Sequence, residues 1–347
     1  MGAVSKLKLE PPLLSLLGFI ISIAYIPGIV GAAIPTGWFV LIGLMPILIC
    51  FYHKSINVYH IEVILFVTYC GISLVWTQNF NIGLFFFVQL VALGLTFYLG
   101  STLTDLKPIF KGLAVGIGIS GIVSILQKFY DWNFVFRNTG MNAGLFVNQD
   151  LFCEASVIVF ISLIIFELWW WLPFTITGIV LVHSRAAILA LIGCFGIWLW
   201  SKSKIAALVF GFILVCGSAF YLSRGIDDSI RQRLYLWEST VKGFTVLGNG
   251  IGSYQIAYPP FAVNVDTSIE RPKFAHNDFL QFVFEVGIGT IFLILLAYDV
   301  LIIKRKERLI LYAVGIISCF SFPFHIPVMA FIGCLVAGYI TKFDGAV

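Results

Sequence analysis

A polar loop that leads into a long apolar segment carries residue types suited to acid–base chemistry. His276 is followed by Asn277 and Asp278, which are common helix-capping residues, and an apolar run of helical length begins at Phe279. We therefore expect His276 to lie at the N-terminus of a helix, where the positive end of the helix dipole disfavours an imidazolium. A neutral imidazole in that position accepts a proton, and the free amides of the helix attract anions.

Three arginines are candidate ligands for such an anion. Arg185 directly precedes an apolar run that begins at Ala186, where a cation opposes the helix dipole. It either extends to the membrane interface or binds an anionic group of a substrate. Arg231 and Arg233 belong to an expected interfacial helix, whose basic residues usually contact lipid headgroups. Together, guanidinium groups would bind a diphosphate and stabilise it as a leaving group, while His276 deprotonates a hydroxyl.

Glu285 is an acidic residue inside the apolar run that follows His276. A carboxylate is costly to bury in a membrane, so we expect Glu285 to face the interior of the protein and to pair with a cation. The remaining histidines show no spacing that indicates metal ligation: His53, His60, His183 and His325. The residues themselves therefore predict neither a metal nor a cofactor.

The composition is that of an integral membrane protein. The chain has 347 residues, of which 60% are hydrophobic and 11% charged, and its mean hydropathy is +1.01. Apolar runs long enough to cross a hydrocarbon core recur along it, so we expect one polytopic helical membrane domain over residues 1–347. The net charge of +4 comes mostly from Lys and Arg that flank these runs, which argues against a nucleic-acid partner. The seven cysteines lie in or beside apolar runs without paired spacing, so neither disulfides nor a zinc site is expected.

The apolar runs and the polar breaks between them predict an all-α bundle of about twelve transmembrane helices. Lys and Arg are concentrated in the segments that face the cytoplasm if the N-terminus lies there, and this orientation also returns the C-terminus to the cytoplasm. The first run is expected to be an uncleaved span. The predicted spans lie at about residues 13–31, 37–52, 59–76, 82–100, 108–128, 151–167, 169–183, 186–200, 204–222, 277–303, 308–322 and 324–341.

Two segments on the outer face are long enough to carry a function: residues 129–150, and residues 223–276, which precede the tenth span. The second segment contains an expected amphipathic helix. Its apolar residues at helical spacing are Ile230, Leu234, Trp237 and Val241. The opposite face carries Arg231 and Arg233, and a glycine-rich turn follows at residues 248–252. We therefore expect the chemistry on the outer side, in a large loop built around this helix.

Several of these motifs resemble those of the bacterial O-antigen ligase and O-antigen polymerase superfamily. The run from His276 to Leu280, followed by Glu285, resembles its histidine motif, and the run from Ser184 to Ala186 resembles its outer-face arginine motif. Residues 233–237 and 247–254 resemble its periplasmic helix and glycine turn. The similarity covers roughly Gly144 to the C-terminus. One departure is that a single residue separates Gly287 from Gly289, where the common form has two.

The resemblance implies a GT-C-like membrane glycosyltransferase of the bacterial inner membrane, inverting and independent of metals and cofactors, with its active site in the periplasm. Its donor would be a glycan on undecaprenyl diphosphate, used in lipopolysaccharide or surface polysaccharide assembly. The residue roles that the resemblance implies are diphosphate binding by Arg185, Arg233 and, in second rank, Arg231, activation of the acceptor hydroxyl by His276, and support by Glu285 and Asn277.

The acceptor and one alternative function stay open. A ligase uses the lipid A core, a polymerase uses another lipid-linked glycan, and a protein oligosaccharyltransferase uses a side-chain hydroxyl. The alternative is a transporter or flippase for lipid-linked saccharides. Such a protein would carry charged residues deep in several spans and an internal repeat, whereas the charges here cluster at the outer face and no repeat relates the two halves.

Overall fold

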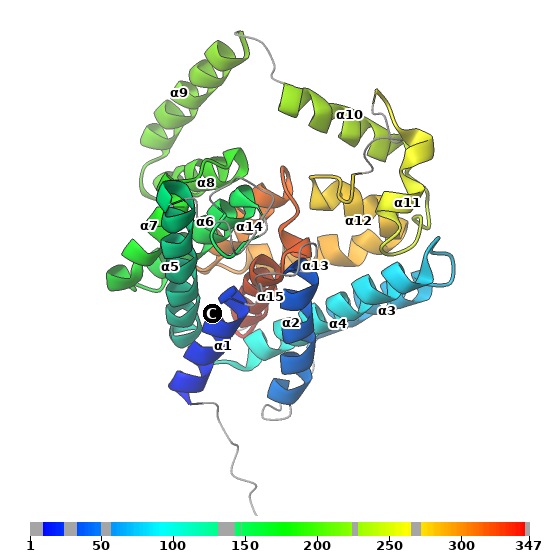
Figure 1. The fold of residues 1–347 in the computed structure, drawn as a ribbon, viewed down its shortest axis with the longest axis horizontal. Coiled ribbons are helices and arrows are strands. Elements are labelled where there is room, and N and C mark those ends of the chain that lie inside the picture. Colours follow the sequence, from blue (N-terminus) through cyan, green and yellow to red (C-terminus); the bar gives the residue numbers. More distant parts are fainter. Residues whose placement is uncertain are drawn as a thin grey trace, which may run out of the picture.

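A computed structural model describes residues 10–23, 33–49, 57–130, 143–146, 148–223, 228–264 and 272–343, and these residues form helices joined by turns (Figure 1). Most of the predicted outer segment 129–150, and residues 224–227 and 265–271 of the large loop, lie outside the described residues. The helices are α1 (Pro11–Ile23), α2 (Ala33–Ile49), α3 (Val58–Ser73), α4 (Phe80–Thr102), α5 (Lys107–Tyr130), α6 (Gln149–Ile165), η1 (Trp169–Trp171), α7 (Pro173–Val180), α8 (Arg185–Lys202), α9 (Lys204–Ser223), α10 (Asp228–Lys242), α11 (Tyr254–Ala257), η2 (Pro259–Phe261), α12 (Asp278–Val286), η3 (Gly287–Gly289), α13 (Thr290–Ile302), α14 (Arg308–Ser318), η4 (Pro323–His325) and α15 (Pro327–Thr341).

The helices coincide with the segments predicted to span the membrane. Each predicted span overlaps a helix, and three overlap more than one: 169–183 holds η1 and α7, 277–303 holds α12, η3 and α13, and 324–341 holds α15 and the end of η4. Within the described ranges, four apolar stretches are long enough to cross a membrane: Phe80–Thr102, Lys107–Phe129, Arg185–Lys202 and Asp278–Ile302. Shorter apolar helices accompany them. This is the pattern of a multi-pass membrane protein, while the number of spans stays a prediction.

Two helices form the centre of the bundle. α15 is buried along nearly its whole length and packs against α4, α14 and α2 (Figure 1). α6 is buried in the same way and packs against α7, α5, α14 and α8. By contrast, α9 and α13 expose apolar side chains, among them Ile205 at 77% and Ile294 at 59%. Helices that contact lipid need apolar faces, so this exposure fits helices at the periphery of a membrane protein.

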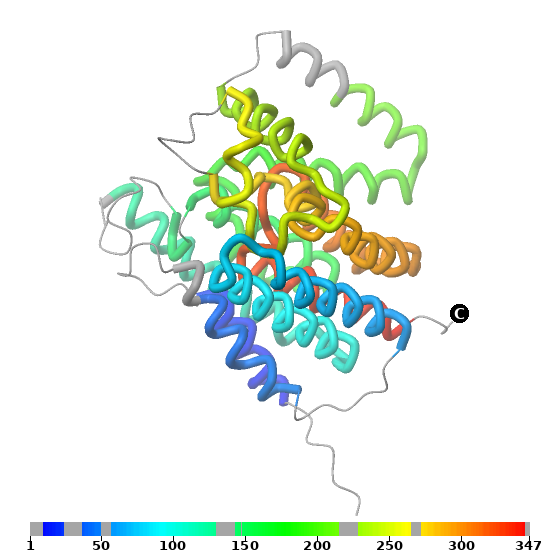
Figure 2. The backbone as a smooth tube through the Cα atoms, turned by 90° about the vertical axis from the view of Figure 1, so that its right-hand side faces the viewer, coloured from blue at the N-terminus to red at the C-terminus, as the bar shows by residue number. Residues whose placement is uncertain are grey.

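The described parts of the large loop, residues 228–264 and 272–276, form a cap at one end of the bundle (Figure 1). α10 coincides with the expected amphipathic helix and packs against α12 and η2, while α11 packs against α12 (Figures 1 and 2). Leu236 of α10 joins Tyr254, Tyr258 and Phe284 in one buried cluster. This cluster fixes α10 beside α12, the helix that His276 precedes.

The glycine-rich turn after α10 closes the C-terminal end of α12. Gly248 and Gly250 have positive φ angles of 76° and 92°, a conformation that glycine adopts without steric cost. The Gly250 amide donates to the Glu285 carbonyl oxygen over 2.8 Å, so the turn satisfies a carbonyl that the helix end leaves without a partner. α12 stops at Gly287, whose φ is 52°, and the chain continues through η3 into α13.

We expect Gly248→Ala to destabilise the fold by about 1–3 kcal/mol. A Cβ at Gly248 would collide with the Glu285 carbonyl oxygen and lie 2.6 Å from the Gly287 amide nitrogen, in a backbone conformation that alanine rarely adopts. Thermal unfolding of the purified protein in detergent measures the loss as a lower Tm. Gly43→Ala is the matched control, because a Cβ there meets nothing within 4 Å. An equal loss in both variants would contradict the collision.

Candidate functional site

The loop between α14 and α15, residues 319–326, is where the candidate residues meet. The Arg233 guanidinium donates through Nη1 to the Phe320 carbonyl oxygen over 3.1 Å. The Asn277 side chain donates through Nδ2 to the Cys319 carbonyl oxygen over 3.1 Å, and its oxygen caps the N-terminus of α12. The 319–326 loop therefore holds α10 and the start of α12 together.

His276 lies just before α12, as predicted. Its ring makes an edge-to-face contact with Phe322 of the 319–326 loop, with 5.1 Å between ring centroids. Burial, with a further contribution from the charge of Arg233, lowers the pKa of His276 to about 4. The imidazole is therefore neutral near pH 7. The neutral form expected from the sequence is present, but burial and Arg233 cause it here, where the sequence had pointed to the helix dipole.

The backbone of His276 is held in an uncommon conformation by its two neighbours. Its φ angle is 52°, which a non-glycine residue adopts only where its surroundings impose it. On one side, the Ala275 carbonyl oxygen accepts from Trp237 Nε1 over 3.1 Å, and the Ala275 amide donates to Gln281 Oε1 over 3.0 Å. On the other side, Asn277 is tied to the 319–326 loop. The direction of the imidazole is therefore set by contacts from three separate segments.

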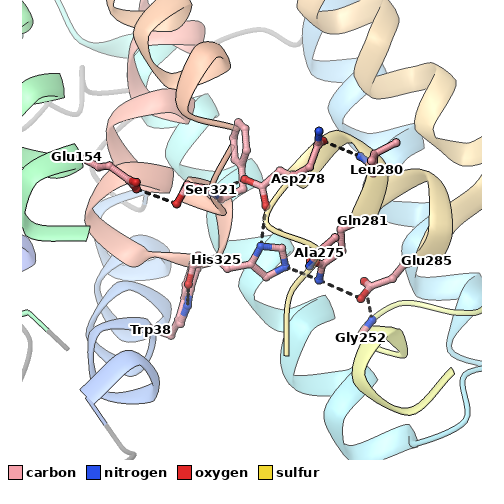
Figure 3. Close-up of polar contacts among 12 residues, drawn as sticks. Trp38, Glu154, Gly252, Ala275, Asp278, Leu280, Gln281, Glu285, Ser321 and His325 are labelled. Carbon is pink, nitrogen blue, oxygen red and sulfur yellow. Dashed lines mark hydrogen bonds and ion pairs between the residues drawn. The ribbon is translucent and has the colours of Figure 1, made fainter. Parts of the chain in front are cut away.

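A buried carboxylate links the turn before α8 to the same loop. Glu154 of α6 is 2% exposed, and its Oε1 accepts from the Ser184 hydroxyl over 3.1 Å. Its Oε2 accepts from the Ser321 hydroxyl over 2.9 Å (Figure 3). Ser184 is the N-cap of α8, whose first residue is Arg185. Glu154 therefore fixes the backbone that carries Arg185 relative to the loop that contacts Arg233.

Electrostatic interactions join the two arginines at the start of α6. Burial raises the pKa of Asp150 above its ordinary value, and the nearby charges of Arg233 and Arg185 partly offset this rise. Arg185 is exposed and lies at the first position of α8. The structure therefore brings Arg185, Arg233 and His276 to one end of the bundle. In the described part of the chain, no group of three or more His, Cys, Asp or Glu side chains that could hold a metal ion is present.

A buried polar network adjoins this site. His325 Nδ1 lies 2.9 Å from Asp278 Oδ1, and Gln281 Nε2 lies 3.2 Å from both His325 Nε2 and Glu285 Oε1 (Figure 3). Because Gln281 Nε2 is a donor to both partners, the pattern fits a His325 ring that carries its proton on Nδ1 and donates it to Asp278. The network ties the 319–326 loop to the first two turns of α12.

Glu285 is buried, as predicted, but its hydrogen-bond partners are amides where the sequence suggested a cation. Its carboxylate accepts from the Gly252 amide over 2.9 Å, from the Tyr254 amide over 3.2 Å and from the Gln281 side chain over 3.2 Å. Glu285 therefore joins the glycine turn to α12 and supports the site from within the fold.

Arg231 lies apart from the other candidates. Its guanidinium pairs with Asp228 over 3.4 Å, and its side chain is 55% exposed. Positions 231 and 233 are about 200° apart around a helix of 3.6 residues per turn. Arg233 shares its face of α10 with the buried residues Leu236 and Thr240. The two arginines therefore do not share the single polar face expected from the sequence.

Four buried polar residues around the site were not predicted as site residues, and Asp278 was predicted only as a helix-capping residue. The four are Glu154, Gln281, Ser321 and His325. His325 was considered only as a metal ligand, and its neighbours in sequence show no ligand spacing. Glu154 is an acidic residue inside an apolar run, which is the same signal that identified Glu285. That signal, applied to every apolar run, would have found Glu154. The two others have no comparable signal in the sequence.

Comparison with known families agrees with the motif resemblance. Residues 171–295 match the family model described as O-antigen ligase. The matched stretch runs from η1 into α13 and includes Arg185, Arg233, His276 and Glu285. No curated protein matches this chain. Residues 171–295 therefore form a domain that matches the O-antigen ligase family.

Proposed function

We propose that this protein is an inverting glycosyltransferase that moves a glycan from undecaprenyl diphosphate to an acceptor hydroxyl. Its O-antigen ligase domain points to glycan ligase or polymerase activity in surface polysaccharide assembly. The observation that carries the proposal is the meeting of Arg233 with a neutral, partly buried His276 at the 319–326 loop. A cation that binds phosphate and an imidazole that accepts a proton are the two groups that this reaction requires.

In the proposed reaction, the acceptor hydroxyl oxygen attacks the anomeric carbon from the side opposite the diphosphate. The new C–O bond forms as the bond from the anomeric carbon to the diphosphate oxygen breaks, so the configuration inverts. Undecaprenyl diphosphate leaves with the bonding electron pair, and Arg185 and Arg233 stabilise its charge. His276 takes the hydroxyl proton. Asn277 and Glu285 support the position of His276, whereas Arg231, the second-rank candidate, lies apart from these groups and is not assigned a contact with the diphosphate.

The negative charge of the bound donor would raise the pKa of His276. In the free protein, burial and Arg233 hold the pKa of His276 at about 4. A diphosphate next to the imidazole offsets the charge of Arg233 and favours the imidazolium, so it raises this pKa towards its ordinary value. A base whose pKa rises when the donor binds is better matched to proton transfer near neutral pH.

We expect Arg233→Gln to raise the pKa of His276, because the variant removes a positive charge that disfavours the imidazolium. Burial remains, so the pKa stays below the ordinary histidine value. NMR of the ¹³C-labelled histidine ring, titrated between about pH 3 and 8, measures the shift directly. Lys242→Gln is the control, since Lys242 is an exposed cation of the same helix that pairs with Glu238 over 2.8 Å. An unchanged His276 titration in Arg233→Gln would show that the two groups are not coupled.

We further propose a GT-C-like arrangement in a bacterial inner membrane. About twelve helices would span the bilayer as a single domain over residues 1–347, with both termini in the cytoplasm. Residues 223–276 would then lie in the periplasm and cover the site. The cap that α10 and α11 form against α12 supports this placement. Two cysteine variants at exposed positions test this placement. The cysteine of Glu238→Cys should be labelled from the periplasm, and the cysteine of Lys304→Cys should be labelled only from the cytoplasm.

The transfer assay tests the reaction itself. Purified protein is incubated with an undecaprenyl-diphosphate oligosaccharide and a candidate acceptor, with and without a chelator. Because two guanidinium groups supply the positive charge at the diphosphate, we expect transfer to persist in chelator and without added cofactor. Strict metal dependence would refute this mechanism. Full activity in both His276→Ala and Arg185→Ala would refute the site.

The acceptor distinguishes the remaining functions. Lipid A core, a second lipid-linked glycan and a protein hydroxyl are supplied in parallel, and the one that becomes glycosylated identifies a ligase, a polymerase or an oligosaccharyltransferase. Proteoliposomes that contain the same labelled lipid test the transporter or flippase alternative. Movement of the lipid between leaflets with no glycan transfer to any acceptor would favour that alternative and overturn the proposal.

We expect Glu154→Ala to lower kcat/KM by about 10–100-fold, while Glu154→Gln keeps most of the activity. Alanine removes both serine contacts and so releases the turn that carries Arg185 from the 319–326 loop. Glutamine keeps both contacts, because it accepts from one hydroxyl and donates to the other. Glu238→Ala, at an exposed position, is the control. If Glu154→Gln lowered kcat/KM as much as Glu154→Ala, activity would depend on the charge of Glu154 and not on its two hydrogen bonds.

A further inference from the structure

Asp150 lies on the face of α6 that also carries Glu154. It belongs to the first turn of this helix, four positions before Glu154, and residues four positions apart are neighbours on one helix face. Glu154 accepts from the hydroxyl of Ser184, which directly precedes Arg185 at the start of α8. A side chain one helical turn before Glu154 therefore lies near the start of α8, where Arg185 is carried.

The same face of α6 adjoins Arg233. Glu154 also accepts from the Ser321 hydroxyl over 2.9 Å (Figure 3). The residue before Ser321 is Phe320, whose carbonyl oxygen accepts from the Arg233 guanidinium. Asp150 is half-buried, and the charges of both arginines act on its carboxyl group. The packing of α6 and the electrostatic interactions thus agree that Asp150 lies near both candidate ligands of the diphosphate.

We expect the carboxyl group of Asp150 to be ionised near neutral pH. An aspartate in water has a pKa of about 3.9, which lies about three units below neutrality. Burial raises the pKa of Asp150, but the two guanidinium groups and the N-terminal amides of α6 favour its carboxylate form. In the free protein, Asp150 therefore offsets part of the positive charge that the two arginines bring to the site.

The donor and the product of the proposed reaction differ in negative charge. Each phosphate of the donor is a diester with a single charge, whereas the product ends in a terminal phosphate that carries about −1.5 to −2 near pH 7. A site with arginines alone would hold the more negative product more tightly than the donor. Such a site would release its product slowly, and product release limits kcat in many enzymes.

We propose that Asp150 weakens the binding of diphosphate at Arg185 and Arg233 and so favours release of the product, undecaprenyl diphosphate. The identity of this anion rests on the proposed function. A carboxylate near the arginines repels both diphosphates, and the repulsion grows with the charge of the ligand, so it acts more strongly on the product than on the donor. A residue that only oriented the arginines would have the opposite effect, because its loss would weaken binding.

The test is a binding measurement on Asp150→Asn, which removes the charge and nearly keeps the shape of the side chain. Dissociation constants of undecaprenyl diphosphate and of the donor, without acceptor, are measured for protein in nanodiscs. We expect Asp150→Asn to bind the product about tenfold and the donor about fivefold more tightly, since the donor carries about two charges and the product about three. Glu238→Gln is the matched control and should change neither constant, because Glu238 is an exposed acid that pairs with Lys242.

Unchanged or weaker binding of undecaprenyl diphosphate to a folded Asp150→Asn protein, verified by its Tm, would overturn the proposal. A role of Asp150 in the stability of α6 alone predicts this outcome, with a lower Tm and the same dissociation constants. Asp150→Ser gives the same comparison if the asparagine variant does not fold, because serine also removes the charge and is favoured at the start of a helix.

Initial rates of glycan transfer separate this inference from the proposed function. We expect Asp150→Asn to lower both the KM of the donor and the inhibition constant of added undecaprenyl diphosphate, with the larger decrease in the inhibition constant. Tighter diphosphate binding in the variant without glycan transfer by the unmodified protein would refute the enzyme and support the role of Asp150. Glycan transfer with equal dissociation constants in both proteins would support the enzyme and overturn the role of Asp150.

Discussion

His276→Ala is expected to lower kcat by about 10²–10⁴-fold, with a much smaller change in the KM of the donor. The imidazole is neutral near pH 7, lies within the influence of Arg233 and is held by Ala275 and Asn277 on either side. Removing it takes away the group that accepts the hydroxyl proton and leaves the diphosphate ligands in place. Initial rates of glycan transfer at varied donor concentration measure both constants.

His183→Ala is the matched control for this effect. His183 is an exposed histidine in the turn before α8, and we expect its variant to transfer at the rate of the unmodified protein. The Tm of both variants has to stay near that of the unmodified protein. A lower rate can then be attributed to the missing imidazole and not to unfolding. A His276→Ala protein that is folded and keeps its kcat would remove His276 from the reaction.

Arg233→Ala is expected to lower kcat/KM by about 10²–10³-fold. Its guanidinium contacts the Phe320 carbonyl oxygen, acts on His276 and Asp150, and is carried by a face of α10 that packs into the protein. A positive charge placed there stabilises the departing diphosphate, so its loss reduces transition-state stabilisation. Lysine should restore only part of the activity, because a single ammonium does not bind a phosphate through two parallel hydrogen bonds.

Arg231→Ala is the informative comparison, since the same residue type lies two positions away on the same helix. Arg231 is exposed and pairs with Asp228, so we expect its variant to lose less than about threefold in kcat/KM. Lys242→Ala, a second exposed cation of α10, serves as the control for a general change in helix charge. Equal losses in Arg231→Ala and Arg233→Ala would mean that the overall charge of α10 matters and that the position of Arg233 does not.

A layer of buried polar residues supports the candidate site. Asp278, His325, Gln281 and Glu285 form a buried chain of polar contacts that connects the 319–326 loop, α12 and the glycine turn. Each of these groups has hydrogen-bond partners, which is the condition under which buried polar residues rigidify a structure. Such a layer would hold Arg233 and His276 within the narrow geometry that the proposed transfer requires.

The sequence alone determined the class of the protein and most of its helices. Long apolar runs separated by polar breaks predicted a helical membrane protein, and the helices coincide with those runs, because burial in lipid forces the backbone to satisfy its hydrogen bonds within each segment. Two predictions from local sequence signals are also confirmed. Asn277 caps α12, and Gly248 and Gly250 adopt the positive φ angles that a tight glycine turn requires. These features depend on a few neighbouring residues, so they can be read from a short stretch of sequence.

Only the tertiary structure decided which side chains meet. It placed Arg233 on the buried face of α10 and Arg231 on the exposed one, because the contact of α10 with α12 selects one face of the helix. It also supplied Glu154 and His325 as partners of residues far away in the chain, Ser321 and Asp278. A buried polar group needs a partner, but nothing in its own segment says from where the partner comes. The packing of α6, α12 and α14 around the 319–326 loop brings these partners together.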